Sequence, residues 1–382
     1  MLAAAVMEAG EALGDMTFTG IFVPGVNRKT YLANPRSTVE TFFVTPELKS
    51  AGNSVRFLPM CVSDIRRRLS TIRIDAALCM VAPPDSDGHC SFGPTVDFLA
   101  ELWPRIPVRI AHINSLVPRT RGHAGIPFAS ITAYTEGPQA LVGTSHSVND
   151  PAAARIAAFA APFITNGATL QIGLGRAPEA VLSALTNRRG LRVHSGMIGD
   201  SVKDLEEAGA LARGAAITTG VAIGSGRLYD AVGGPAYNFQ PVSVTHSPQR
   251  IALIENFVAI NSAMEIDLFG QAYAEMGPVG LLSGPGGASD FARAARASQG
   301  LRIIALSASA SNGTVSRLVL PGAGTGPVSL GRMDVDVVVT EYGAADLRGR
   351  TYQERAELLI AIAAPDHRSS LYAGWRVYAA AL

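Results

Sequence analysis

The sequence has few of the residues and patterns that mark metal-binding and disulfide-bonded proteins. It contains three cysteines in 382 residues, Cys61, Cys79 and Cys90, and no two of them form a C-x-x-C pair. Its histidines also stand alone, without a second ligand at metal spacing. Because zinc sites and disulfide frameworks need such pairs, we expect reduced cytoplasmic thiols and no metal site.

An excess of either charge and long apolar runs are lacking as well. Lysine and arginine total 32 against 31 aspartates and glutamates, which gives a net charge of +1. A nucleic-acid-binding protein needs a net basic face, so this balance argues against that class. No apolar run approaches the about 18 residues of a membrane span. Glu8, Glu11 and Asp15 interrupt the N-terminal stretch, which looks like an amphipathic helix and not a signal peptide.

Two common catalytic signatures are also absent. The sequence has no G-x-S-x-G elbow and no G-x-x-x-x-G-K-[ST] loop, which argues against an α/β-hydrolase triad and a P-loop nucleotidase. What the chain has in abundance is apolar residues, 48% against 16% charged. That composition provides for large buried cores and is consistent with a homodimer.

Apolar runs alternate along the chain with alanine-rich segments of helical spacing. The strand-like runs are residues 73–84, 107–117, 250–261, 301–310 and 334–343, and the helical segments are 152–164, 177–188, 289–299 and 351–363. Near-continuous apolar strands between helices predict an α/β fold with mostly parallel sheets buried on both faces. A polar stretch at 144–151 is the best boundary, so we expect two domains, 1–150 and 151–382.

The first glycine-rich turn contains Gly173 and Gly175, between a predicted strand and a predicted helix. Glycines there let a phosphate or thioester approach backbone N–H groups, so this turn is a candidate cofactor-binding site. The alternative is a tight structural turn, because the third glycine of a dinucleotide fingerprint is missing.

A second turn contains Gly284, Gly286 and Gly287 ahead of a helix. Exposed amides in such a turn can bind an anion or form an oxyanion hole. The alternative is a structural turn in which Ser289 or Asp290 caps the helix.

Glu341 stands at the end of a predicted strand, ahead of Gly343. This is a typical position for a site residue in an open sheet. The alternative is a structural ion pair with Arg348 or Arg350. A fourth motif, the acidic turn at residues 83–93, has too few acids for a calcium loop, and we interpret it as structural.

In this order, the segments resemble the acetyl-CoA hydrolase/transferase family, which includes acetate and 4-hydroxybutyrate CoA-transferases. The resemblance extends over almost the whole chain. It is carried by GIFVPGVNR (20–28), PPDSDGHCSFG (83–93), VPRTRG (117–122), LQIGLG (170–175), VHSGMIGD (193–200), LYD (228–230), AINSAMEIDLFGQ (259–271), SGPGGASDFARAA (283–295), GTVSRLV (313–319) and VVVTEYGAADLRGRTYQERAELLI (337–360).

The resemblance implies a fold and a mechanism. The fold would be two similar open α/β domains with mostly parallel sheets, CoA-transferase-like and of the NagB/RpiA type, with the active site between them. In the family a glutamate attacks the acyl-CoA carbonyl. An anhydride and then a glutamyl-CoA thioester form, and CoA passes to an acceptor carboxylate.

This sequence departs from the family pattern at the nucleophile. The family segment has the form Glu-x-x-Asn-x-Pro, and counting back from Pro248 places Ser243 at the glutamate and His246 at the asparagine. On an extended strand residues 243 and 246 would face opposite ways, so a Ser243–His246 dyad is not favoured. The acids nearby are Glu255, Glu265 and Glu275, and the last matches an acid common in the family at that loop. The opening strand and glycine loop of family members are also missing, which implies an altered first domain.

We therefore expect an enzyme that transfers CoA from an acyl-CoA to a small carboxylate, or hydrolyses the thioester. Coenzyme A, as the acyl-CoA substrate, would lie on the glycine turns, and the candidate catalytic residues are Ser243, Glu275 and Glu341. One alternative is a degenerate homologue that binds CoA esters or a partner. Another is a recruited activity, acyl transfer or ring formation on a CoA-bound substrate.

Overall fold

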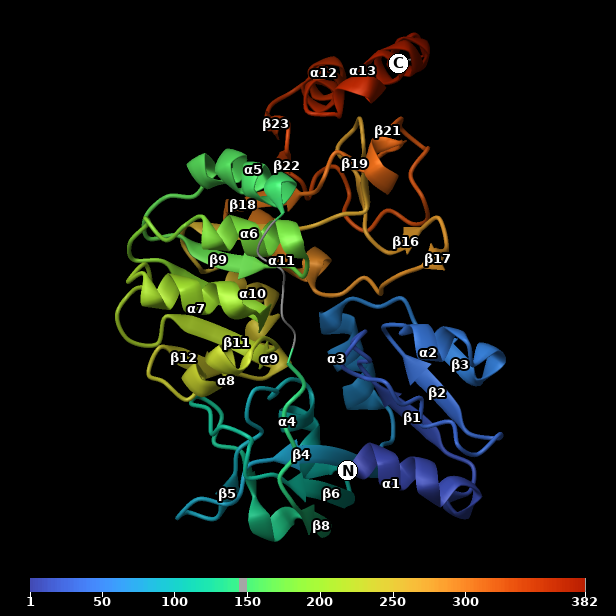
Figure 1. Cartoon of the computed structure of the whole chain (residues 1–382), viewed down its shortest axis with the longest axis vertical. Helices are drawn as coiled ribbons and strands as arrows, with labels where there is room; N and C mark the ends of the chain where they lie inside the picture. The colour runs from blue at the N-terminus through green and yellow to red at the C-terminus, as the bar shows by residue number, and fades with distance from the viewer. Residues whose placement is uncertain (144–149, 382) are drawn as a thin grey trace.

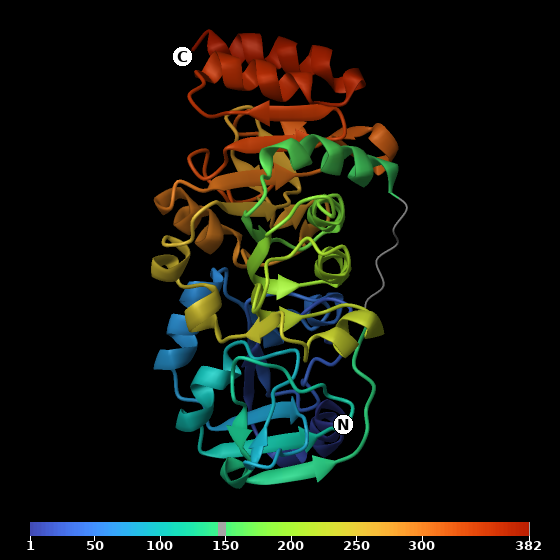
Figure 2. The same ribbon diagram turned by 90° about the vertical axis from the view of Figure 1, so that its left-hand side faces the viewer.

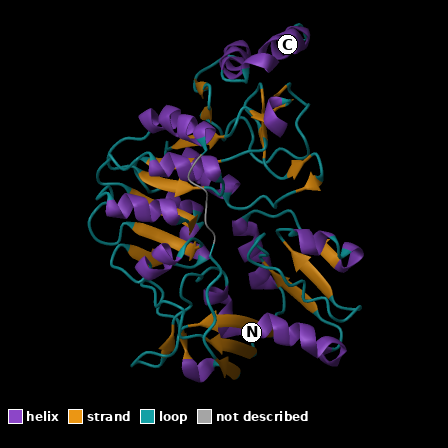
Figure 3. Cartoon of the chain, viewed as in Figure 1, coloured by secondary structure: helices purple, strands orange, loops and turns teal. Residues whose placement is uncertain are grey.

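The computed structural model describes residues 1–143 and 150–381. The chain begins at one end of an elongated molecule, and its last two helices lie at the other end (Figure 1). Helices and strands are interleaved along most of its length (Figure 3). This arrangement confirms the predicted α/β class.

In the described residues the largest sheet has eight strands in the order β12-β11-β10-β9-β13-β18-β22-β23. Every neighbouring pair is parallel except β22 with β23. The strands are β9 (Thr169–Ile172), β10 (Arg192–Ile198), β11 (Ile217–Ala222), β12 (Tyr237–Phe239), β13 (Phe257–Asn261), β18 (Leu301–Ala305), β22 (Val337–Thr340) and β23 (Gly343–Asp346). The chain runs outward from β9 in one direction and from β13 in the other, so the order reverses between these two strands. In open α/β sheets ligands bind at this switch point, at the carboxyl ends of the strands.

Helices cover both faces of this sheet. One set is α5 (Pro151–Ala160), α6 (Arg176–Ser183), α7 (Asp200–Glu207) and α8 (Gly226–Ala231), and the other is α9 (Val242–Thr245), α10 (Pro248–Ile251) and α11 (Ala288–Ala297). Figure 2 shows the two sets on opposite sides of the strands. Because both faces are covered, every residue of β9, β13 and β22 is buried. The predicted parallel, doubly covered sheet is therefore confirmed.

The N-terminal part forms two smaller parallel sheets. In the described residues each has three strands, β1 (Thr17–Gly20), β2 (Thr38–Thr41) and β3 (Val55–Phe57) in one, and β4 (Ala76–Val81), β6 (Val108–Ile113) and β8 (Ala133–Glu136) in the other. Its helices are α1 (Leu2–Ala9), α2 (Pro46–Lys49), α3 (Val62–Thr71) and α4 (Leu99–Leu102), and β5 (His89–Cys90) pairs antiparallel with β7 (Ile126–Pro127). The predicted boundary segment lies mostly at residues 144–149, outside the described residues, so the two domains stay a prediction.

Short elements complete the C-terminal part. They are the sheet of β14 (Glu265–Asp267), β15 (Ala272–Tyr273) and β21 (Leu318–Val319), the hairpins β16 (Met276–Gly277) with β17 (Gly280–Leu281) and β19 (Ser309–Ala310) with β20 (Val315–Ser316), and the helices α12 (Tyr352–Ala361) and α13 (Pro365–Ala379). Among the described helices, none has the length and apolar character needed to cross a bilayer.

The loop 283–287 joins the N-terminal part to the large sheet. A Cβ at Gly284 would lie 1.9 Å from the carbonyl oxygen of Phe42, so backbone packs directly on backbone. Two residues later, the carbonyl oxygen of Gly286 accepts a hydrogen bond from the Val62 amide, at 3.1 Å. This second glycine turn thus has a structural role, which was one of its two predicted interpretations.

Asp290 extends this contact. Its carboxylate accepts hydrogen bonds from the amide and the hydroxyl of Ser63, at 3.0 and 2.6 Å, and so caps the start of α3. The sequence had offered Ser289 or Asp290 as the cap of their own helix, but α11 has no side-chain cap. Only 5% of Asp290 is exposed at this junction, and this burial raises the pKa of its carboxyl group.

We expect Gly284→Ala to destabilise the protein by about 3 kcal/mol or more, because the new methyl group would force the loop away from Phe42. Gly226→Ala is the matched control, since a Cβ there meets no atom within 4 Å and the residue is helical. The control should be neutral or stabilising by up to about 1 kcal/mol. Urea denaturation measures both, and equal midpoints for the two variants would contradict this account of the junction.

Candidate functional site

The first glycine turn lies at the switch point of the large sheet. It follows β9, and a Cβ at Gly173 would lie 2.6 Å from Oδ1 of Asn261 at the end of β13. Gly175 has φ 127°, which favours glycine, and lies against Ser262. The Asn261 side chain exchanges amide hydrogen bonds with Gln171, at 3.2 and 3.0 Å. The turn therefore has both a structural reason for its glycines and the position of a ligand site.

Glu341 lies at the same carboxyl edge, in the turn between β22 and β23. Its carboxylate is buried and accepts a hydrogen bond from the amide of Ala308, at 2.8 Å. The alternative interpretation, an ion pair with Arg348 or Arg350, is wrong, because Arg348 pairs with Asp346 and Arg350 with Glu354. No arginine therefore neutralises Glu341 within the described contacts.

The other acids near the predicted site differ in their surroundings. Glu275 is buried and accepts from the Ser329 hydroxyl at 2.8 Å, and Glu265 accepts from the amide and hydroxyl of Thr325. Glu255 is exposed and precedes β13, so it lies at the amino edge of the sheet. Glu255 is thus on the wrong side to take part in a site at the carboxyl edge.

Ser243 lies in a helix and not on a strand, which corrects the extended geometry assumed from the sequence. It belongs to the single-turn helix α9, and its amide donates to Oε1 of Glu101 at 2.7 Å. The other oxygen of Glu101 accepts from Nε of Arg66 at 2.6 Å. In the described contacts the Ser243 side chain forms no bond with His246, whose Nδ1 lies 3.0 Å from the Thr245 hydroxyl. A Ser243–His246 dyad is thus not formed in the described contacts, as predicted. The reason is that His246 bonds to Thr245, and not that the two residues lie on opposite faces of a strand.

His246 fills the space between two glycines. A Cβ would lie 2.4 Å from its ring at Gly196 and 2.7 Å from it at Gly287. The imidazole also packs on Phe291, with ring centroids 4.8 Å apart. Burial lowers the pKa of His246 to about 3, so the ring is neutral at physiological pH.

The chain matches known proteins over most of its length. The Acetyl-CoA hydrolase/transferase C-terminal domain matches residues 224–374. The 4-hydroxybutyrate coenzyme A transferase of Clostridium kluyveri is 37% identical over 308 residues, which cover 78% of this chain and 71% of that protein. A succinyl-CoA:acetate/propanoyl-CoA:succinate CoA transferase of Fasciola hepatica is 35% identical over 88% of this chain and 75% of its own length. The chain belongs to the acetyl-CoA hydrolase/transferase family.

Solved structures agree with this assignment. RipA from Yersinia pestis superposes with a TM-score of 0.86 and 26% identity, over 99% of both chains. The 4-hydroxybutyrate CoA-transferase from Porphyromonas gingivalis gives a TM-score of 0.80 and 28% identity, over 98% of this chain and 96% of that one. The CoA-transferase-like fold expected from the sequence is therefore confirmed.

The predicted site residues do not gather into one cluster of mutual contacts. Gly173 and Gly175 pack on β13, Glu341 bonds to the loop after β18, and Glu275 bonds to Ser329. Gly287 lies against the ring of His246, which follows Ser243 by three residues. In the described part of the chain no three His, Cys, Asp or Glu residues are arranged to hold a metal ion.

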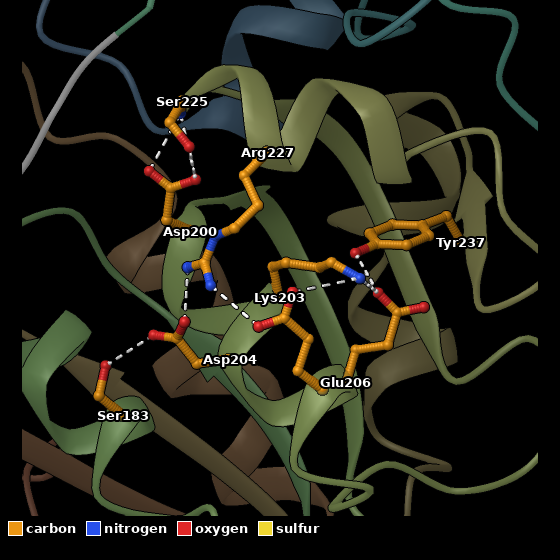
Figure 4. A network of polar contacts seen from close by, with 9 residues as sticks. Ser183, Asp200, Lys203, Asp204, Glu206, Ser225, Arg227 and Tyr237 are labelled. Carbon is orange, nitrogen blue, oxygen red and sulfur yellow. Dashed lines mark hydrogen bonds and ion pairs between the residues drawn. The ribbon is translucent and has the colours of Figure 1, made fainter.

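A polar network over α6, α7 and α8 (Figure 4) includes Asp200, an acid of the family-like segment 193–200. Asp200 accepts from the amide and hydroxyl of Ser225, and Tyr237 donates to Glu206. The ion pairs of the network are Arg227 with Asp204 and Glu207, and Lys203 with Glu206 and Glu207. Burial raises the pKa of Tyr237. Two cations face four carboxylates here, and each of these groups has a partner within the network, so we assign the network a structural role.

Sequence reasoning missed two acids of the N-terminal part, Asp97 and Glu101. The segment before them pairs with β11, where the Val96 amide donates to the carbonyl of Gly220 at 2.9 Å. Asp97 has φ 38°, an uncommon conformation for a residue with a side chain, and burial raises its pKa to about 7. Strain and a shifted pKa together mark a functional-site candidate. In the sequence, the only indication of a site here is the spacing of four residues between Asp97 and Glu101, and this spacing matches no known motif.

A cavity of about 360 Å³ lies away from these residues. It is at the carboxyl ends of β4, β6 and β8, and it is lined by Pro83, Pro84, Ile113, Ser115, Glu136, Gly137 and Pro138. Because none of the predicted site residues lines it, the cavity is not part of the candidate site.

We predict that His246 makes the stability of the protein pH-dependent. Its folded-state pKa lies below the unfolded value of about 6.5, so its stabilising contribution is present above pH 6.5 and is lost as the pH falls. Between pH 7.5 and pH 5 the loss should be about 2 kcal/mol. His246→Asn should reduce that loss, as measured by urea denaturation at both pH values. An unchanged pH dependence in the variant would show that other groups cause it.

Proposed function

We propose that this protein transfers CoA from an acyl-CoA to a small carboxylate. The observation that carries the proposal is the glycine turn at Gly173 and Gly175, which lies at the switch point of a CoA-transferase-like fold. The named relatives are CoA-transferases, and acetyl-CoA hydrolases of Candida albicans and Kluyveromyces lactis match a shorter part of the chain. Transfer of CoA between carboxylates therefore agrees best with the fold and the relatives together.

In this proposal coenzyme A binds along the carboxyl edge of the large sheet. The Gly175 amide lies close to the thioester, since this residue has no side chain to block it. The Gly173 amide already donates to the carbonyl of Ile260 at 2.7 Å, so Gly173 contributes by shaping the turn. Glu341 and Glu275 position the acceptor carboxylate or a water molecule. Both are buried, and each keeps one carboxylate oxygen without a described side-chain partner. Hydrolysis is the same chemistry with water as the acceptor.

Ser243 is not the nucleophile in this proposal. A serine ester would be a poor acyl donor to a carboxylate, and the hydroxyl has no bond to a base in the described contacts. Gly284, Gly286 and Gly287 stabilise the junction between the two parts of the chain. In this proposal they contribute to CoA binding only indirectly, by fixing the backbone of the loop. A homodimer in the cytoplasm stays part of the proposal, motivated by the composition of the chain.

The test is incubation of the purified protein with acetyl-, butyryl- and 4-hydroxybutyryl-CoA, each with acetate, succinate or propionate. We expect formation of the acceptor's CoA thioester, detected by liquid chromatography and mass spectrometry. Release of free CoA without a new thioester would indicate hydrolysis. No reaction with any pair, together with measurable CoA-ester binding, would indicate the degenerate homologue.

Glu341→Gln is expected to lower kcat/KM about 100-fold, because the amide keeps the bond to Ala308 and loses the charge that positions the acceptor. Glu357→Gln is the matched control, an exposed change on α12 whose only described bond is to Gln353. Steady-state kinetics with the best acyl-CoA compare the two variants. A decrease of the same size in both would remove Glu341 from the proposed site.

A further inference from the structure

Three arginines gather at the amino edge of the large sheet, where a buried carboxylate pairs with only one of them. Arg302 is in β18, Arg332 lies in the turn before β22, and Arg355 belongs to α12. Asp336 accepts from Arg302 through both of its oxygens, and its Oδ2 is 2.7 Å from Nε of Arg302. Arg302 also donates to the carbonyl of Met333, at 2.9 Å, directly beside Arg332. The bonding capacity of Asp336 is thus used by Arg302.

The guanidinium of Arg332 has no hydrogen-bond partner among the described residues. Its Nε is buried, and no acceptor lies within bonding distance of it. Asp334 belongs to the same turn, yet the ion pairs of this region involve other residues. Buried N–H groups in folded proteins nearly always have a partner, so an unsatisfied one points to an acceptor from outside the chain.

Arg355 lies near Arg332 and is also without a carboxylate partner in the described contacts. Its Nη1 donates to the carbonyl of Phe269 at 3.0 Å, which is the only bond described for this side chain. Burial lowers the pKa of Arg355, and the charge of Arg332 acts in the same direction, whereas Tyr352 and Asp336 oppose them. Two like charges held together in this way favour the binding of an anion between them.

The position of Arg355 is fixed by a glycine turn. Gly270 has φ 87°, which favours glycine, and a Cβ there would lie 3.3 Å from Nη1 of Arg355 and 2.8 Å from the Leu347 side chain. The turn therefore leaves the room that Arg355 needs to reach the Phe269 carbonyl. A guanidinium held at one end presents its other N–H groups in a defined direction.

This edge of the sheet is opposite to the edge with the first glycine turn. Arg332 precedes β22 and Glu341 follows it, so the four residues of β22 separate the two positions by about 13 Å. The antiparallel strand β23 brings the chain back to the amino edge, since Asp346 lies opposite Val337, and α12 begins there. Figure 1 shows α12 at the end of the molecule away from the N-terminal part. The arginine pair is therefore remote from the proposed CoA site.

The donors of the pair suit a phosphate group. Each guanidinium offers N–H groups in a planar fork, which matches the oxygens of a phosphate or a carboxylate. A phosphate monoester carries between about 1.5 and 2 negative charges near neutral pH, whereas a carboxylate carries one. Because two cations are uncompensated here, the charge favours phosphate.

Aromatic side chains border the two arginines. Tyr352 packs on Phe269, with ring centroids 4.6 Å apart, and 41% of Tyr352 is exposed. Tyr378 packs on the same ring at 5.6 Å, and 38% of it is exposed. Exposed rings beside a phosphate-binding pair can stack with a nucleobase. The rings therefore favour a nucleotide over free phosphate as the source of the phosphate group.

We propose that Arg332 and Arg355 together bind the phosphate group of a small ligand, at a site separate from the proposed CoA site. The phosphate oxygens accept from Nε of Arg332 and from the N–H groups of Arg355 that point away from Phe269. A nucleobase attached to this phosphate stacks on Tyr352. The site exists whether or not the protein transfers CoA, because none of the residues proposed for that reaction belongs to it.

The first test measures binding to the unmodified full-length protein by isothermal titration calorimetry. The probes are inorganic phosphate, adenosine 5′-monophosphate, adenosine and acetate. We expect both phosphate-containing probes to bind, and the nucleotide at least about fivefold more tightly, because stacking adds to its affinity. Equal affinities would support the phosphate site and identify the free ion as its ligand. Binding of acetate or adenosine alone, or of no probe, would overturn the proposal.

Protection from chemical modification locates the site without any variant. Phenylglyoxal modifies accessible guanidiniums, and peptide mass mapping reports the extent at each arginine. We expect the nucleotide to reduce modification of Arg332 and Arg355 at least about threefold. Arg213 is the internal control, since it is exposed and has no described side-chain bond, and its modification should not change. Protection confined to other arginines would place the nucleotide elsewhere and contradict the proposal.

Variants separate this site from the proposed function. Arg332→Gln and Arg355→Gln should each weaken nucleotide binding at least about tenfold, because each removes a charged fork. Arg213→Gln, the matched control with the same change of charge, should bind normally. All three should keep the Kd for coenzyme A within about threefold. An equal loss of coenzyme A affinity in the first two would assign these arginines to the substrate site and overturn the proposal, whereas failure of the unmodified protein to react with any acyl-CoA would affect only the proposed function.

Discussion

The contact of Gly284 with the Phe42 carbonyl holds the N-terminal part of the chain against the part that contains the large sheet. Backbone rests on backbone there, so no side chain can intervene. The Val62 amide and the Ser63 side chain then bond to Gly286 and Asp290, which fixes the start of α3 against the start of α11. Because α3 carries Arg66, this junction also determines where the Glu101 carboxylate points.

The glycines at the junction also explain the course of α9. His246 follows α9 directly, and its ring lies where side chains at Gly196 or Gly287 would otherwise be. One end of α9 is thus held by the large sheet and by the glycine loop, and the other end bonds to Glu101. A substitution at Ser243 or His246 therefore affects a helix that is held at both ends.

Much of the fold could be predicted from the sequence, because its strands are apolar on both faces. The runs that become β13 and β22 have this character, and a strand buried between two layers of helices needs it. The order of the strands within the sheet was not predictable, since it depends on which strands pair across long distances. The same limit applies to Asp290, whose partner Ser63 is 227 positions away.

The candidate site was predictable only where a local pattern defines it. A glycine turn after a strand, as at Gly173, and an acid before a turn, as at Glu341, can be recognised without knowing the fold. The extended conformation predicted at Ser243 is wrong, because a four-residue helix is too short for a helical period to show in the sequence. The contact between Glu101 and Ser243 could not be predicted, since the two residues are 142 positions apart in the sequence.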